Sequence, residues 1–116
     1  MVPSSAGMRN WGENKMKKII NNKLYDTEKA KKICDFKISI KHESFFFPIY
    51  LYHEACIYKT NKGTYLEYIG KCVEPEEDYE KYRRLEVISI NEVKKVLIQI
   101  NAIDVYISEF GELEEG

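Results

Sequence analysis

The chain has 116 residues, 44% apolar and 32% charged, a length that suits one domain and is too short for two ordinary ones. A chain of this size buries roughly two-thirds of the surface that its unfolded form exposes, so its core needs no disulfide framework. Three cysteines without a Cys-x-x-Cys spacing indicate a reducing cytoplasm rather than a secreted scaffold. The sequence contains no run of about 18 apolar residues, so we expect no segment that spans a membrane.

The formal net charge of −1 conceals an uneven distribution along the chain. Residues 1–73 hold 13 basic and 7 acidic side chains, a net charge of +6, whereas residues 74–116 hold 5 and 12, a net charge of −7. If the fold keeps these halves apart, the molecule has one basic and one acidic surface, each able to steer a partner of opposite charge. The alternative is that both signs interleave in space and only solvate the surface.

The N-terminal part of the chain predicts a leader, a small hairpin and a helix. Residues 1–15 are mostly small and polar, and we interpret them as a disordered leader or extension with no resemblance to a secretory signal. Asn21 and Asn22 tolerate the positive φ of a tight turn, which predicts a hairpin around them. Asp26 is a capping residue followed by an acidic first turn, so we expect a short cationic helix over residues 27–35.

Four strands are predicted in the middle of the chain. Alternating apolar and polar residues predict a half-buried strand over residues 36–41, with a basic outer row. Residues 49–59 and 64–70 are rich in tyrosine and β-branched side chains, and Gly63 favours the turn between these two strands. We expect the fourth strand over residues 85–90.

Two helices are predicted at the C-terminus. Ser89 and Glu92 have the spacing of a capping box, so a helix should begin after Ser89. Apolar residues then recur with the spacing of one buried stripe, and the same spacing returns over residues 103–110. Asp104 could cap this second helix and Gly111 could end it.

These elements indicate an α+β fold with a single domain over residues 16–112 and an acidic tail over residues 113–116. We expect an antiparallel sheet of about four strands plus a small N-terminal hairpin. One short N-terminal helix and the C-terminal helix pair should pack on this sheet. An exposed sheet edge could pair two copies, but the sequence does not indicate the oligomeric state.

Catalytic and metal-binding motifs are weak in this sequence. Residues 53–56 resemble the zinc motif H-E-x-x-H, but the second histidine is missing and a strand would turn residues 53 and 56 to opposite faces. A zinc site built from His42, His53, Cys56 and Cys72 remains an alternative, as does a Cys56 nucleophile beside a histidine. No glycine-rich phosphate loop occurs. We therefore expect neither an enzyme nor a bound metal or cofactor.

An acidic segment around Pro75 is a candidate for partner binding. Closely spaced carboxylates could imitate a phosphate backbone and occupy the cationic channel of a nuclease. The alternative is a solvated loop, because a flexible segment cannot hold two carboxylates at the fixed separation that acid–base catalysis requires. The candidate residues are Glu74, Glu76, Glu77, Asp78 and Glu80.

The basic half of the chain supports a different hypothesis, in which lysines contact phosphates and aromatic rings stack on bases. No arginine occurs between Arg9 and Arg83, so such binding would be nonspecific and sensitive to salt. The candidate residues for contact with a partner or a nucleic acid are Lys29, Lys32, Lys37, Lys41, Tyr58, Tyr65, Tyr82, Arg83 and Arg84.

Three segments resemble a group of small proteins from mobile elements of low-GC Gram-positive bacteria. The first is the K-I-I-N-x-K-x-Y-D-T-E-x-A opening at residues 18–30, and the second is E-x-x-I-Y-K-T-x-x-G-x-Y-x-x-Y-x-G at residues 54–70. The third is Ile88-Ser89 before the C-terminal helices, together with Phe110-Gly111-Glu112. These segments cover most of residues 17–112.

The resemblance implies a shared fold, because the matching motifs are a turn, a cap and a hairpin. It also implies a non-enzymatic, cytoplasmic anti-CRISPR protein that binds a bacterial type II RNA-guided nuclease or its guide RNA complex. The alternative is a nonspecific nucleic-acid-binding accessory protein of a mobile element. The sequence departs from the group at Asn22, where glycine is usual, and in the acidic loop after Gly70, so the partner could differ.

Overall fold

The computed structural model describes residues 15–74, 76–77 and 83–116. In chain order, the elements are β1 (Lys17–Ile20), β2 (Lys23–Asp26), the 3-10 turn η1 (Thr27–Lys29), β3 (Lys31–His42), β4 (Ile49–Lys59), β5 (Tyr65–Glu74), β6 (Glu76–Glu77), β7 (Arg84–Ile88), α2 (Ile90–Gln99) and α3 (Ile103–Phe110).

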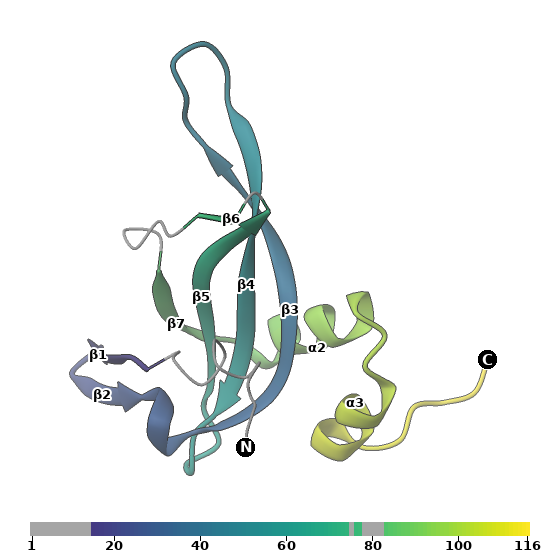
Figure 1. Cartoon of the computed structure of the whole chain (residues 1–116). Helices are drawn as coiled ribbons and strands as arrows, with labels where there is room; N and C mark the ends of the chain where they lie inside the picture. The colour runs from purple at the N-terminus through teal and green to yellow at the C-terminus, as the bar shows by residue number, and fades with distance from the viewer. Residues whose placement is uncertain (1–14, 75, 78–82) are drawn as a thin grey trace, which may run out of the picture.

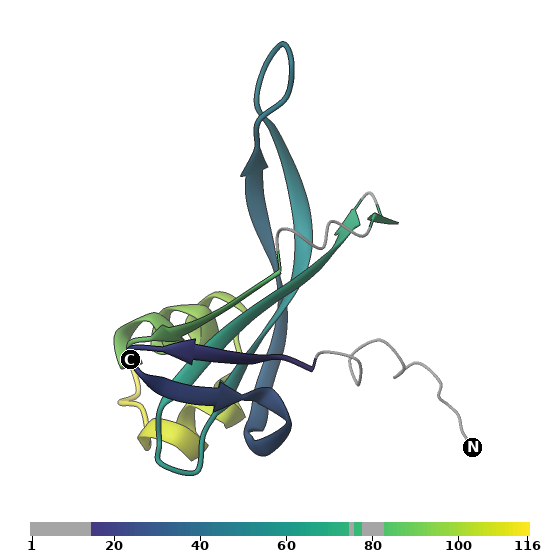
Figure 2. The same ribbon diagram turned by 90° about the vertical axis from the view of Figure 1, so that its left-hand side faces the viewer.

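The elements form three layers, with the main sheet in the middle (Figure 1). Strands β3, β4 and β5 are antiparallel neighbours, and the far edge of β5 pairs first with β7 and then with the two-residue β6. Hairpin β1–β2 lies on one side of this sheet and helices α2 and α3 lie on the other, as the turned view also shows (Figure 2). This arrangement confirms the predicted α+β class and the antiparallel sheet.

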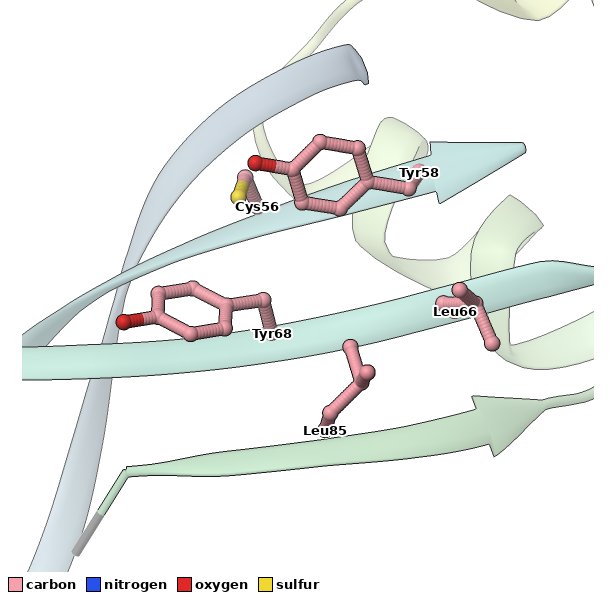
Figure 3. Close-up of a cluster of buried hydrophobic side chains, with 5 residues drawn as sticks. All are labelled: Cys56, Tyr58, Leu66, Tyr68 and Leu85. Carbon is pink, nitrogen blue, oxygen red and sulfur yellow. The ribbon is translucent and has the colours of Figure 1, made fainter. Parts of the chain in front are cut away.

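Each face of the sheet carries its own apolar cluster. The cluster beneath the N-terminal hairpin consists of Cys56, Tyr58, Leu66, Tyr68 and Leu85, whose side chains project from β4, β5 and β7 (Figure 3). The cluster beneath the helices consists of Ile57, Tyr65, Ile88, Val93 and Leu97. Because neighbouring strand residues face opposite sides, both sides of the sheet bury apolar surface.

Both predicted hairpin turns are confirmed. Asn21 and Asn22 have φ values of 52° and 65°, the left-handed conformation that a two-residue turn between β1 and β2 requires. Gly63 has a φ of 87° in the turn between β4 and β5. A side chain there would be strained, which explains why glycine occupies this position.

The predicted helix over residues 27–35 is wrong. Only the three residues of η1 are helical, capped by Asp26 Oδ1, which accepts a hydrogen bond from the Glu28 N–H at 2.9 Å. Ala30 is already extended, and Lys31 pairs with Lys59 across β3 and β4. Pairing with β4 satisfies the backbone groups of this segment along a long ladder, whereas a short helix would have had only a thin apolar stripe to hold it.

A β-bulge adjusts the start of β3. The register with β4 shifts between Lys32 and Cys34, and Ile33 and Cys34 both pack against the cluster beneath the helices. A regular strand would turn adjacent side chains to opposite faces. The bulge therefore explains how two adjacent apolar residues, a pattern that also fits one side of a helix, can face the same cluster from a strand.

The remaining strands follow the prediction with shifted ends. Strand β4 has the predicted bounds, and β3 extends at both ends beyond the predicted residues 36–41. Strand β5 continues to Glu74 instead of ending at residue 70, and β7 ends at Ile88 instead of residue 90.

The C-terminal helices begin and end for different local reasons. Ser89 and Glu92 form the predicted capping box: Ser89 Oγ accepts from the Glu92 N–H at 3.1 Å, and Glu92 Oε1 accepts from the Ser89 N–H at 3.0 Å. Helix α3 begins after Ala102 without a side-chain cap, so the predicted capping role of Asp104 is wrong. Asp104 lies in the first turn, where its carboxylate interacts favourably with the helix dipole. Gly111 ends the helix with a φ of 97°.

Candidate functional site

The hairpin of β3 and β4 extends well beyond the other strands (Figures 1 and 2). Strand β5 pairs with β4 only as far as Tyr52, so residues 39–52 form a two-stranded ribbon that we call the arm. Apart from Leu51 and His42, its side chains are exposed or half-buried. A two-stranded ribbon is marginally stable by itself, so the arm depends on the sheet at its base.

Three consecutive phenylalanines at the end of the arm form an aromatic tip. The exposed fractions of Phe45, Phe46 and Phe47 are 92%, 83% and 63%. The Phe45 and Phe46 rings meet edge to face with centroids 4.9 Å apart, and the Ser44 hydroxyl donates a hydrogen bond to the Phe47 carbonyl. Adjoining aromatic rings left in water mark an interaction surface.

Lysines and tyrosines share one face of the hairpin. Lys41 pairs with Tyr50 across the two strands, Ser39 pairs with Tyr52, and Lys37 precedes them on the same face of β3. Both lysines and both tyrosines are exposed. Cationic and aromatic groups therefore alternate on a surface that solvent reaches.

The two other predicted lysines lie away from the arm. Lys29 is exposed in η1. Lys32 lies at the base of β3, where its ammonium group forms an ion pair with Asp35 at 3.1 Å. The structure therefore brings Lys37 and Lys41 together, and it places Lys29 and Lys32 near the other end of the hairpin.

Tyr58 and Tyr65, predicted to stack on bases, are buried. Tyr58 belongs to the cluster beneath the N-terminal hairpin, where burial raises the pKa of its hydroxyl well above the ordinary value. Tyr65 belongs to the cluster beneath the helices, and its hydroxyl donates to Glu109 Oε1 at 2.7 Å. Their exposed fractions are only 7% and 6%, so this fold gives no support to base stacking by either ring. Among the tyrosines that the structure describes, Tyr50 and Tyr52 are the exposed ones.

The acidic and arginine candidates are only partly described. Arg84 is exposed at the start of β7, and the preceding Arg83 is half-buried. Glu74, Glu76 and Glu77 lie in β5 and β6, and their side chains lie outside the description. Asp78, Glu80 and Tyr82 lie outside the described residues altogether. The acidic surface therefore stays a prediction.

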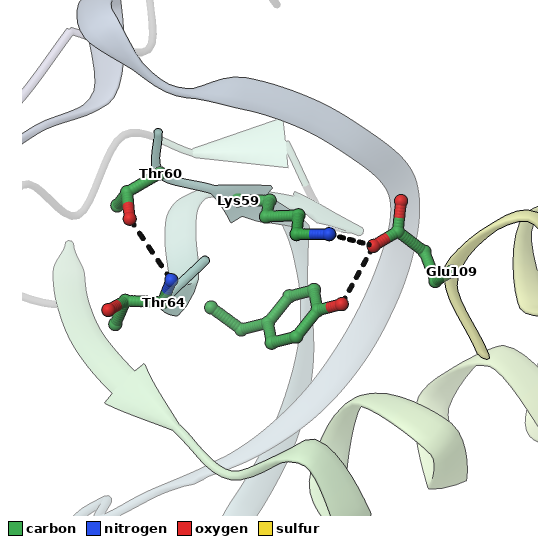
Figure 4. A network of polar contacts seen from close by, with 5 residues as sticks. Lys59, Thr60, Thr64 and Glu109 are labelled. Carbon is green, nitrogen blue, oxygen red and sulfur yellow. Dashed lines mark hydrogen bonds and ion pairs between the residues drawn. The ribbon is translucent and has the colours of Figure 1, made fainter. Parts of the chain in front are cut away.

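A polar network joins α3 to the sheet (Figure 4). Glu109 Oε1 accepts hydrogen bonds from the Lys59 ammonium group at 3.0 Å and from the Tyr65 hydroxyl. Burial opposes ionisation of Glu109, but these two donors outweigh it and hold the pKa of the carboxyl below its usual value. At the turn below, the Thr64 N–H donates to Thr60 Oγ1 at 3.1 Å. We interpret this network as structural because all of its members hold protein elements together.

His42 and His53 form a buried pair at the base of the arm. Their Nε2 atoms are 3.0 Å apart and the rings are stacked, with an interplanar angle of 6°. His53 Nδ1 lies 2.9 Å from the Gly70 carbonyl, which only accepts, so His53 must carry its proton on Nδ1. In the neutral pair, His53 Nε2 then accepts a hydrogen bond from His42 Nε2–H. The contacts fix one tautomer of each ring, which suits a structural pair.

Glu54 lies against Gly70 on the face of β4 opposite to His53. A Cβ atom at Gly70 would stand 3.0 Å from Glu54 Cγ and Oε1 and 2.9 Å from Tyr68 Cε2. Burial raises the pKa of Glu54, partly offset by Lys71, whose N–H bonds to the carboxylate, and by Arg83. The glycine is therefore needed for close packing of two buried side chains.

The candidates for catalysis and metal binding do not come together. Cys56 faces the cluster beneath the N-terminal hairpin, whereas His53 lies on the opposite face of β4. Burial raises the pKa of Cys56 to about 12 and that of Cys34 to about 11, so neither thiol ionises readily. Within the described residues, no group of three or more histidine, cysteine or acidic side chains is placed to hold a metal ion. The proposed zinc set of His42, His53, Cys56 and Cys72 does not assemble.

Over the ranges that the structure covers, no helix has the length and apolar character needed to cross a membrane. The segments that resemble mobile-element proteins contain the two hairpin turns, the Glu54–Gly70 contact and the capping box. Membership of that group stays a prediction. The chain matches no family model, no curated protein and no solved structure.

Proposed function

We propose that the chain is a non-enzymatic anti-CRISPR inhibitor that binds a bacterial type II RNA-guided nuclease, or its guide RNA complex, through the arm. The observation that carries the binding role is the aromatic tip, where three phenylalanine side chains lie in water at the end of a projecting hairpin. Burying such rings in a partner's apolar pocket yields roughly 1.5–3 kcal/mol for each. The choice of partner and the bacterial cytoplasm as the location come from the sequence resemblance.

The arm suits an inhibitor because a narrow projecting ribbon reaches into a channel that a compact body cannot enter. Lys41 on its flank, and Lys37 just before the arm on the same face of β3, add charge contacts, which favour association with RNA or with an acidic surface. The layered body then serves as the rigid base from which the arm projects.

Co-purification with a type II effector, with and without guide RNA and at low and moderate salt, tests the proposal. A variant with Phe45→Ser, Phe46→Ser and Phe47→Ser should weaken association by at least about 30-fold, equivalent to about 2 kcal/mol. Ile98→Ser on α2 is the matched control, because this apolar residue is also exposed but lies away from the arm. Failure of the unmodified chain to associate under every condition would remove the inhibitor proposal. Equal binding by the triple variant would remove the arm as the contact surface.

A second candidate function is nonspecific binding of single-stranded nucleic acid. The observation that favours it is the face on which Lys37 and Lys41 lie with the exposed rings of Tyr50 and Tyr52. Lysines would contact phosphates while tyrosines stack on bases, without reading sequence.

Electrophoretic mobility shifts with single-stranded RNA and DNA distinguish the two functions. Nucleic-acid binding should weaken steeply as salt increases and should be lost in a variant with Lys29, Lys32, Lys37 and Lys41 changed to glutamate. Lys94→Glu with Lys95→Glu on α2 shows whether charge reversal away from this face also weakens binding. Absence of any shift at low salt would exclude the second function and leave the inhibitor proposal intact.

A further inference from the structure

A cavity of about 660 Å³ lies between the N-terminal hairpin and the turn that joins β4 to β5. Strand β2 and η1 form one wall, and residues 60–64 form the other. Figures 1 and 2 both show these segments side by side, at the end of the molecule opposite to the aromatic tip. The volume lies within the range of small-molecule binding sites, roughly 300–1,000 Å³.

The cavity is cationic. Lys23 from β2, Lys29 from η1 and Lys62 from the turn all line it, and Asp26 is the only acidic residue among the described residues of its lining. One oxygen of Asp26 already accepts the hydrogen bond that caps η1. Among the described residues, none of the three lysines has an ion-pair partner, so their charges are left for an anion.

Neutral donors accompany these charges on the wall formed by the turn. Thr60 Oγ1 accepts the Thr64 N–H, so the Thr60 hydroxyl hydrogen is left to donate to a ligand. Asn61 contributes an exposed amide. Ammonium, hydroxyl and amide groups around one space are the donors that phosphate oxygens accept from.

The other wall has an apolar part. Tyr25 and Ala30 line the cavity and also pack against the buried cluster of β4, β5 and β7. Their contact with the core holds this surface in place. An apolar surface beside a cluster of cations suits a ligand that has a ring system at one end and phosphate at the other.

We propose that this cavity is a nucleotide-binding site, in which Lys23, Lys29 and Lys62 hold the phosphates and the Tyr25 wall contacts the base. The site is separate from the arm, and its occupancy does not depend on the partner proposed for the arm. The cavity volume is of the size that a single nucleotide needs.

Thermal unfolding of the full chain in the presence of ATP, adenosine or inorganic tripolyphosphate tests the proposal. ATP should raise Tm in a saturable manner, because a ligand that binds only the folded state stabilises it. Adenosine should have little effect, and tripolyphosphate should bind more weakly than ATP. Each of Lys23→Ala, Lys29→Ala and Lys62→Ala should weaken the apparent affinity about fivefold, equivalent to about 1 kcal/mol.

Lys94→Ala with Lys95→Ala is the matched control, because it removes two cations from α2 and leaves the cavity unchanged. Retained ATP binding in this control, together with its loss in a triple variant that combines Lys23→Ala, Lys29→Ala and Lys62→Ala, would support the site. No saturable shift with ATP, or an equal shift in the triple variant, would overturn it. Tripolyphosphate binding as tight as that of ATP would overturn the assignment of the Tyr25 wall to the base.

Discussion

Replacement of Gly70 by alanine should destabilise the protein through a clash at one point of the sheet. The added methyl group would lie 2.9 Å from Tyr68 Cε2 and 3.0 Å from two atoms of Glu54. Both neighbours are buried, so neither can move into solvent. Such overpacking costs about 1–3 kcal/mol. For a domain of this size, each 1 kcal/mol lowers Tm by roughly 4 °C.

A double-mutant cycle isolates the clash. Glu54→Ala removes the Cγ and Oε1 atoms that the new methyl group would meet, so Gly70→Ala should cost less in that background, with a coupling of about 1 kcal/mol. Gly63→Ala is the control, because its cost comes from a φ of 87° with no neighbour within 4 Å, and it should combine additively with Glu54→Ala. Urea unfolding followed by circular dichroism measures all of these variants. A Gly70→Ala protein as stable as the unmodified chain would refute the close packing.

Three further predictions concern burial and charge. Leu97→Ala should lower the free energy of unfolding by about 2–5 kcal/mol, whereas the neighbouring Ile98→Ala should change it by less than about 0.5 kcal/mol, because their exposed fractions are 1% and 66%. Urea titration compares the two, and equal losses would contradict this placement of α2. Burial raises the pKa of Cys56 to about 12, so its thiol should react with iodoacetamide far more slowly in the folded chain than in urea. Rapid labelling of Cys56 in the folded chain would count against its burial. Lys59 helps to hold the pKa of Glu109 below its usual value in the folded chain, so the stability that the ionised carboxylate contributes is lost as the pH falls through that lowered pKa. Acid should therefore lower Tm less in a Lys59→Met variant than in the unmodified protein. An identical fall of Tm in acid would show that the ion pair contributes nothing.

Features specified by adjacent residues were predictable from the sequence. The Asn21-Asn22 turn, the glycine turn at residue 63 and the Ser89–Glu92 capping box were all anticipated, because each depends on the backbone preference or side-chain reach of a few neighbouring residues. The tyrosine and β-branched side chains of residues 49–59, followed by the Gly63 turn, likewise predicted the bounds of β4.

The candidate site was much less predictable. Lys37 and Lys41 were identified, but the aromatic rings beside them are Tyr50 and Tyr52 rather than the buried Tyr58 and Tyr65. The strand pattern does not distinguish these four tyrosines. Which of them are buried depends on the pairing with β5 and on the packing of the N-terminal hairpin and the helices against the sheet. The three consecutive phenylalanines before Pro48 are the signal in the sequence for the aromatic tip.

By itself, the sequence determined the fold class, the turns and the start of α2, since these follow from local preferences and apolar periodicity. Tertiary structure decided that residues 31–35 continue β3 instead of forming a helix, because the ladder with β4 satisfies their backbone groups and a bulge lets the half-buried Ile33 and Cys34 both pack against the cluster beneath the helices. It also decided which surfaces remain for binding. Strand β5 stops pairing at Tyr52 and leaves the arm in solvent, while the N-terminal hairpin docks near the β4–β5 turn and encloses the cationic cavity.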